Sequence, residues 1–411
     1  MTHVRHRHPR HTPEGTLVHS SSVLRRLAAG AGSIALVAGL AGCTQPVEAA
    51  EPAGALALVI GAHGNMPVPT ADGAAAAALV AAMDAQSYLS VFVADGDPFE
   101  LDAWSLAVSD ANDQAAEADR AAHRQRINAD LAGAAAQTPE VDLLGAIDEA
   151  ARSITSRSGQ HTIVVVDSGL STVAPLDFTQ PGMLDADPAE IATSLAAAGE
   201  LPELAGADVV LQGLGDTADP QPAIGRAQQA NLIGIWTAIA EAAGARDVQV
   251  EQAPLTGSAA PGLPDVSIVP TGSSVRCSAG TVTLTGGDVA FRPDSADFAD
   301  PDAARATLGP IAEQLVDASS TATVTGTTAR VGDLDGQRSL SRERAQAVSG
   351  LLADLGVPTA SMTVLGLGSE FPGYVVDHDA AGNLIPAAAA ANRTVVIDLA
   401  GAPAGVTCAS A

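Results

Sequence analysis

Three short stretches near the C-terminus decide the fold of this part of the chain: Gly326-Thr327-Thr328-Ala329-Arg330, Leu340-Ser341-Arg342-Glu343-Arg344-Ala345-Gln346-Ala347-Val348 and Asn392-Arg393-Thr394-Val395-Val396-Ile397. The first follows an expected strand at 321–325, the second lies in an expected helix at 339–355, and the third opens an expected strand at 394–399. Gly356 and Pro358 are signals that end such a helix. The pattern predicts an α+β domain with a mixed sheet and helices on one face, completed by elements at 281–284, 289–291, 302–317 and 362–365.

These stretches resemble the OmpA-like peptidoglycan-binding domain, whose pattern runs Gly-His-Thr-Asp, a short loop, Leu-Ser-x-x-Arg-Ala-x-x-Val and a final Asn-Arg before the last strand. The resemblance covers residues 288–398. It implies a site for the peptidoglycan stem peptide, in which the aspartate accepts the ammonium of diaminopimelate and the helix arginine binds its carboxylate. Here Ala329 replaces the aspartate, whereas Arg344 keeps the arginine. The resemblance therefore implies a weakened site.

Other side chains are expected near this site. Arg393 and Asn392 belong to the closing motif, and Asp333 and Asp335 fall in the expected loop, where either could replace the missing acceptor. One lost charge-assisted hydrogen bond costs about 1.5–3 kcal/mol, which corresponds to roughly a ten- to hundredfold loss of affinity. The alternative is that the fold is kept for structure or protein contacts and no longer binds peptidoglycan.

The composition restricts the partners. The 411 residues carry a formal net charge of −27 and include no lysine, so no basic patch is expected to neutralise a phosphate backbone. We expect no nucleic-acid binding. The length suits two domains.

The N-terminus has the pattern of a lipoprotein signal peptide. Residues 1–42 carry five arginines against one acid, and the apolar run at 27–40 is shorter than the roughly 20 residues that span a bilayer. Leu40-Ala41-Gly42-Cys43 matches the bacterial lipobox, in which the cysteine thiol accepts the diacylglycerol, with palmitate as a further acyl group. We expect a signal peptide at 1–42, lipidation of Cys43, and a tether at 43–54 that leaves the protein anchored to a membrane in the cell envelope. The alternative is ordinary cleavage beside an incidental cysteine.

The other two cysteines are expected to pair. Cys277 and Cys408 bracket the OmpA-like segment, and disulfides persist in exported proteins. A bridge closing so long a loop contributes about 4–5 kcal/mol in the chain-entropy model. Neither cysteine has ligands at metal-binding spacing, so we expect no metal there.

Residues 55–251 alternate apolar runs with alanine-rich helical stretches, which predicts an α/β domain with a doubly wound, mostly parallel sheet. A linker rich in proline, glycine and serine is expected at 252–274, followed by the OmpA-like domain at 275–411. The expected strands are 56–60, 89–93, 162–166, 209–211 and 248–250, and the expected helices are 73–85, 111–136, 141–153, 188–198 and 222–243.

Polar residues follow the expected strands of this first domain, where parallel sheets bind ligands. They also suit helix caps and turns. These residues are His63, Asn65, Asp95, Asp97, Asp167, Ser168, Ser171 and Asp216.

The stretch Ile163-Val164-Val165-Val166-Asp167-Ser168-Gly169 loosely resembles a von Willebrand factor A-type domain. The metal site of that family needs Asp-x-Ser-x-Ser after the first strand, because carboxylate and hydroxyl oxygens converge on a hard cation. This chain reads Gly61-Ala62-His63-Gly64-Asn65 instead, so no metal is expected. Ser168 lacks a Gly-x-Ser-x-Gly elbow, and we expect no catalytic residues and no cofactor.

These patterns favour a membrane-anchored envelope lipoprotein that associates non-covalently with peptidoglycan, as a structural tether or as an adaptor for another envelope protein. The competing hypothesis is a ligand-binding or hydrolytic α/β domain that a degenerate OmpA-like domain merely localises.

Overall fold

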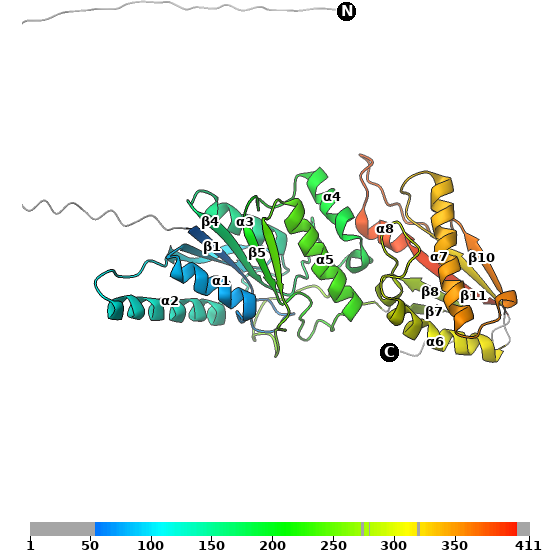
Figure 1. The fold of residues 1–411 in the computed structure, drawn as a ribbon, viewed down its shortest axis with the longest axis horizontal. Coiled ribbons are helices and arrows are strands. Elements are labelled where there is room, and N and C mark those ends of the chain that lie inside the picture. The colour runs from blue at the N-terminus through cyan, green and yellow to red at the C-terminus, as the bar shows by residue number, and fades with distance from the viewer. Residues whose placement is uncertain (1–53, 273–274, 279, 319–320, 401–411) are drawn as a thin grey trace, which may run out of the picture. The chain divides into compact units, whose positions relative to one another are not determined.

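The computed structural model describes residues 54–272, 275–278, 280–318 and 321–400 (Figure 1). The expected signal peptide at 1–42, the lipidation site Cys43 and the disulfide partner Cys408 lie outside these residues. The lipid anchor and the Cys277–Cys408 bridge therefore stay predictions. None of the described helices is both long and apolar enough to cross a membrane.

The first sheet confirms the predicted α/β class. Its strands run in the order β3-β2-β1-β4-β5-β6, which is the order of many doubly wound sheets. All neighbours are parallel except β2 and β3. The strands are β1 (Gly54–Gly61), β2 (Tyr88–Ala94), β3 (Phe99–Ser105), β4 (Gln160–Val166), β5 (Asp208–Gln212) and β6 (Asp247–Glu251).

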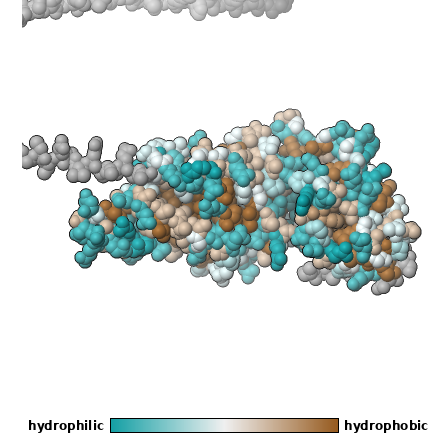
Figure 2. Space-filling model, in the orientation of Figure 1, coloured by the Kyte–Doolittle hydropathy of each residue, from teal (hydrophilic) through white to brown (hydrophobic). Residues whose placement is uncertain are grey.

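Helices cover both faces of this sheet, which explains why its central strands are continuously apolar. Alternate residues of β1 enter two separate cores: Ala57 and Val59 pack with α3, α4 and α5, whereas Leu58 and Ile60 pack with α1 and α2. Teal, hydrophilic residues dominate the surface over α2 (Figure 2). The helices are α1 (Gly73–Asp84), α2 (Asp113–Gly133), α3 (Leu143–Thr155), α4 (Pro188–Ala198) and α5 (Arg226–Ala242).

The second sheet confirms the mixed α+β prediction. Its order is β10-β9-β11-β8-β7, with β9 and β10 parallel and the other neighbours antiparallel. Helices α6 and α7 pack on it through one apolar core. The elements are β7 (Val275–Ser278), β8 (Thr281–Thr285), α6 (Pro301–Ala318), β9 (Thr321–Gly326), α7 (Leu334–Asp354), β10 (Met362–Gly366), α8 (Pro386–Asn392) and β11 (Thr394–Ala400).

Several local predictions were wrong. The stretch 289–291 is not a strand, because a 3-10 turn at Gly287–Val289 precedes a single bridge between Phe291 and Phe298. Helix α7 begins at Leu334 rather than at 339, since Asp333 caps it through the Gly336 amide, 2.9 Å away. The strands β3 and β7 and the helix α8 were missed.

Two glycines set the position of α7 over the sheet. Gly326 of β9 and Gly366 of β10 lie side by side in register. A Cβ atom on Gly326 would lie 1.9 Å from the Ser341 carbonyl oxygen, and one on Gly366 would lie 2.5 Å from the Arg342 amide nitrogen. The helix therefore approaches closely only because neither residue has a side chain. Arg344 follows one turn later on the same helix.

The expected linker at 252–274 contains no strand in its described part, residues 252–272. It is nevertheless packed. Val269 is fully buried in the core that contains α3 and α5, and the Gln221 amide binds both its N–H and its C=O groups, at 2.8 and 3.0 Å. The boundaries of the expected domains stay a prediction.

Candidate functional site

Arg344 lies in the third turn of α7 and is only 7% exposed. Its Nε donates to the Ser295 carbonyl oxygen at 2.9 Å, and its Cζ lies 5.4 Å from the Phe291 ring centroid. Within the described part of the chain, neither Nη nitrogen has a hydrogen-bond partner, and no carboxylate lies within ion-pair distance. Arg344 is therefore a buried cation with two unused donor groups.

The surroundings disfavour the charge on Arg344. Burial, with a smaller contribution from nearby Arg393, lowers the pKa of Arg344 to about 10, and Asp294 opposes this shift. The guanidinium still carries its charge at neutral pH. Since a buried cation without a partner is costly, an anion that reached it would be bound favourably.

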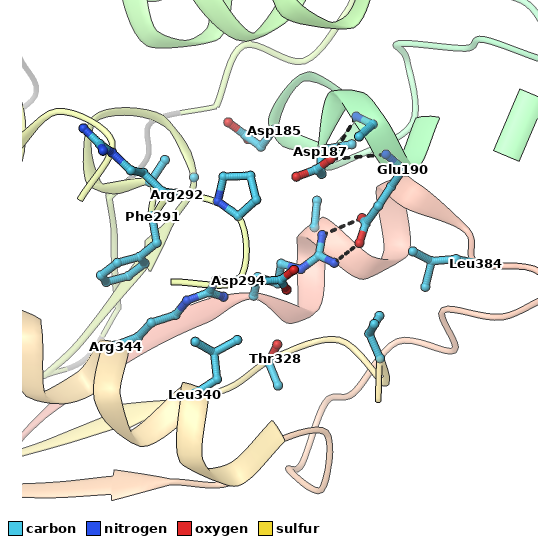
Figure 3. A pocket seen from close by; sticks show the side chains of 18 of the residues that line it. Asp185, Asp187, Glu190, Phe291, Arg292, Asp294, Thr328, Leu340, Arg344 and Leu384 are labelled. Carbon is cyan, nitrogen blue, oxygen red and sulfur yellow. Dashed lines mark hydrogen bonds and ion pairs between the residues drawn. The ribbon is translucent and has the colours of Figure 1, made fainter. Parts of the chain in front are cut away.

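Arg393 differs because it already has a partner. It lies between α8 and β11, and its Nη1 and Nη2 donate to the two carboxylate oxygens of Glu190 at 2.8 and 2.5 Å (Figure 3). Glu190 belongs to the first turn of α4. Both side chains are about one-fifth exposed, at 23% and 22%. This is a bidentate, partly solvent-accessible ion pair.

A cavity of about 840 Å³ joins these groups. Arg344 and Arg393 line it together with Asp294 and Glu190, and the close-up shows Asp294 between the α7 and α4 sides (Figure 3). Asp294 has a left-handed backbone with φ of 48°, a conformation that aspartate tolerates better than most residues. Its carboxylate accepts no hydrogen bond from any described residue. The volume suits a small polar ligand or the end of a peptide.

Ala329 is buried, at 1% exposed, and does not line the cavity. The carboxylate beside it is Asp377, whose Oδ2 accepts from the Arg330 amide at 2.8 Å. Asp377 also binds the hydroxyl of Tyr374 and the ring of His378. These hydrogen bonds lower the pKa of Asp377 despite the burial that opposes them. The carboxylate of Asp377 is therefore used to hold the loop beside Ala329, and it does not replace the missing aspartate as a ligand acceptor.

Asn392 is fully buried and also binds this loop. Its Nδ2 donates to the Val375 carbonyl at 2.7 Å and to Asp377 at 3.1 Å, while its Oδ1 accepts from the Val375 amide at 2.9 Å. Asn392 is thus placed to position Arg393 next to it rather than to contact a ligand.

The two proposed replacement acceptors lie elsewhere. Asp333 is the N-cap of α7, and the side chain of Asp335 is 98% exposed, 3.9 Å from Arg338. Neither lines the cavity. The structure does not bring them to Arg344, because α7 starts five residues earlier than predicted, with Asp333 as its cap and Asp335 in its first turn.

The polar residues that follow β1 and β4 do meet, but inside the protein. His63 Nε2 lies 2.9 Å from Asp167 Oδ2, and the other His63 nitrogen faces Asn65. All three, with Ser168, are at most 1% exposed. No cluster of three or more metal-ligating side chains occurs among the described residues.

Sequence reasoning missed Asp294 and Glu190. Asp294 follows Phe291 within the segment that resembles the OmpA-like domain, so the sequence offered this acidic residue as a further candidate acceptor. Glu190 lies about 200 positions from Arg393 in the chain, so no local pattern could link them.

The five-stranded mixed sheet and the helices packed on it form a small α+β domain, and the arginine-lined cavity lies against it. Residues 290–381 match the OmpA family, so the chain carries an OmpA family domain. The predicted resemblance is confirmed for this segment, whereas the likeness of the first sheet to a von Willebrand factor A-type domain stays a prediction.

Several solved structures also match part of the chain. The peptidoglycan-associated lipoprotein from Burkholderia pseudomallei is 28% identical, with 27% of this chain and 88% of that one covered and a TM-score of 0.23. The cell wall anchor of the T6SS from Pseudomonas aeruginosa is 25% identical, with 29% and 80% covered and a TM-score of 0.23. The periplasmic domain of Helicobacter pylori MotB is 18% identical, with 31% and 88% covered and a TM-score of 0.25. The comparison with curated proteins gives no match.

Proposed function

We propose that this protein is a cell-envelope protein whose OmpA family domain binds peptidoglycan non-covalently through a carboxylate of the stem peptide. The observation that carries the proposal is Arg344, a buried cation whose two Nη groups have no partner among the described residues and which lines a cavity. The fork of a guanidinium matches a carboxylate with two hydrogen bonds. The match of residues 290–381 to the OmpA family supports the same ligand.

The amino group of a zwitterionic ligand needs an acceptor, which Ala329 does not provide. We propose Asp294 for this role, because its carboxylate lines the same cavity and Asp333 and Asp335 do not. Arg344 and Asp294 both line the cavity, which therefore offers both charges that diaminopimelate requires.

The first test removes the charge of Arg344. We expect Arg344→Met to reduce co-sedimentation of residues 44–411 with purified peptidoglycan at least tenfold. Because the charge is buried and unpaired, the unfolding free energy should stay unchanged or rise, as when buried charges are replaced by apolar residues. A variant that merely damages the fold would lose stability as well.

Arg338→Met is the matched control, since Arg338 lies on the same helix but is exposed and paired with Glu370. It should keep wild-type binding. Equal binding by wild type and Arg344→Met would refute the proposal and favour a domain kept for structure or protein contacts.

We further propose that Cys43 carries the lipid, that residues 43–54 act as a tether, and that the protein joins a membrane to the wall or presents its first domain to another envelope protein. We expect Cys43→Ala to lose incorporation of a palmitate analogue in cells and to move from the membrane fraction to the soluble fraction. Cys277→Ala should keep the label. Label retained in Cys43→Ala would exclude lipidation at this thiol.

The hydrolytic alternative gains no support from the first sheet. Ser168, His63 and Asp167 are at most 1% exposed, so a substrate would have no path to them in this conformation. We expect hydrolase assays on the wild-type protein to be negative with and without divalent metal.

A further inference from the structure

We propose that Glu190 is an internal competitor of the ligand: it occupies Arg393 in the free protein, and the ligand carboxylate must displace it to reach full affinity. This inference rests on the proposed binding of peptidoglycan at Arg344. It concerns the contact between α4 and the arginine site, which the OmpA family motifs do not include.

The geometry of the pair is that of a bound carboxylate. Both oxygens of Glu190 accept from the two terminal nitrogens of Arg393, at 2.5 and 2.8 Å. A ligand carboxylate would use the same fork. Arg393 and Arg344 line one cavity, so an anion bound at Arg344 lies beside the group that Glu190 already occupies.

The first turn of α4 holds Glu190 in place. Asp187 caps the helix by accepting from the Ala189 and Glu190 amides at 2.9 and 3.2 Å, and Pro188 occupies the first helical position. The backbone that carries Glu190 is therefore ordered, and only its side chain must rotate to release Arg393.

Apolar packing keeps α8 close to this turn. Ala387 and Ala390 are buried in the core that also contains Met183 and Leu184. A Cβ atom on Gly182 would lie 2.7 Å from the Ala387 carbonyl oxygen. Since this packing does not depend on the ion pair, breaking the pair should leave the contact in place. The pair itself is about one-fifth exposed, so water and a ligand can reach it.

The two arginines thus differ in availability: the Nη groups of Arg344 have no partner among the described residues, whereas those of Arg393 are occupied by Glu190. A carboxylate first binds Arg344 and then competes with Glu190 for Arg393. If the competent state is only fractionally populated, the apparent affinity falls by that fraction. A partly exposed ion pair supports a penalty of about fivefold.

The test measures binding of residues 44–411 to two probes, purified peptidoglycan and a soluble diaminopimelate-containing stem peptide. Glu190→Gln keeps the size of the side chain and removes its charge. We expect it to bind both probes about fivefold more tightly than wild type. Glu241→Gln, an exposed change on α5, is the matched control and should bind as wild type does.

A double-mutant cycle ties the effect to Arg393. Glu190→Gln should improve binding in the presence of Arg393 but give no gain in the Arg393→Met background. A gain in binding that persists without Arg393 would overturn the inference. Tighter binding of peptidoglycan without tighter binding of the stem peptide would also overturn it, because α4 would then be a steric barrier instead of a competitor.

The outcomes separate this inference from the proposed function. Wild-type binding that depends on Arg344 but is unchanged by Glu190→Gln would refute the competition and leave peptidoglycan binding intact. Failure of the wild type and of Glu190→Gln to bind either probe would refute both. Binding by Glu190→Gln but not by the wild type would support both, and would show that Glu190 occupies Arg393 almost completely in the unliganded protein.

Discussion

Replacing Gly326 by alanine is expected to lower the free energy of unfolding of the C-terminal sheet by about 3 kcal/mol and to abolish peptidoglycan binding. The new Cβ atom would lie 1.9 Å from the Ser341 carbonyl oxygen, which is helix backbone and cannot rotate away. Either α7 or β9 must therefore move. Chemical denaturation followed by circular dichroism, with hydrogen exchange in α7 to locate the change, measures the loss.

The binding loss follows from the same movement. Ser341 and Arg344 are separated by one turn of α7, so a shift that relieves the clash displaces the guanidinium from Ser295 and from the cavity. A displacement of about 1 Å is enough to weaken a bidentate contact strongly.

Gly350→Ala is the control for Gly326→Ala. Gly350 lies on the exposed side of α7, and its added Cβ atom would meet nothing within 4 Å. Alanine should stabilise the helix there by about 0.5–1 kcal/mol. If Gly326→Ala proved as stable as Gly350→Ala, the close helix–strand contact would not be a constraint in solution.

The region around this glycine contact also shows which parts of the fold the sequence predicts. The motif around Gly326 and Arg344 predicted the mixed sheet, because its spacing reflects a strand, a turn and a helix that must pack together. The continuous apolar runs at 56–60 and 162–166 predicted a sheet covered on both faces, because a strand with both faces buried has no polar side to expose. In both cases the requirement for packing is visible in a short stretch of sequence.

What the sequence did not predict depends on local polarity or on distant contacts. The start of α7 was missed because Asp333, Asp335 and Gly336 are turn-forming residues that here serve a helix cap. The edge strand β3 is partly exposed and lacks an apolar run. Glu190 could not be connected to Arg393, since only tertiary packing brings α4 and α8 together.

The second large effect is expected in the first sheet. His63→Ala should lower the free energy of unfolding by about 3–5 kcal/mol, because it leaves the Asp167 carboxylate buried without its side-chain partner. Asp167 is fully buried, and after the loss of His63 its remaining hydrogen bond comes from the Gly169 amide, at 2.6 Å. Thermal unfolding followed by tryptophan fluorescence is a suitable measurement, since the Trp236 indole donates to the Gly169 carbonyl at 2.9 Å.

His161→Ala is the control for this change, because His161 lies at the opposite end of β4 and binds only a backbone carbonyl at the surface. His161→Ala should lower the free energy of unfolding by less than about 1 kcal/mol.

Adding Asp167→Asn to His63→Ala removes the unpaired charge and should recover part of the loss, which would show that the cost comes from the isolated carboxylate. A loss below about 1 kcal/mol for His63→Ala would mean that water reaches Asp167 once the ring is gone. The carboxyl ends of β1 and β4 would then be open enough to hold a ligand, and the first domain would have a candidate ligand site there.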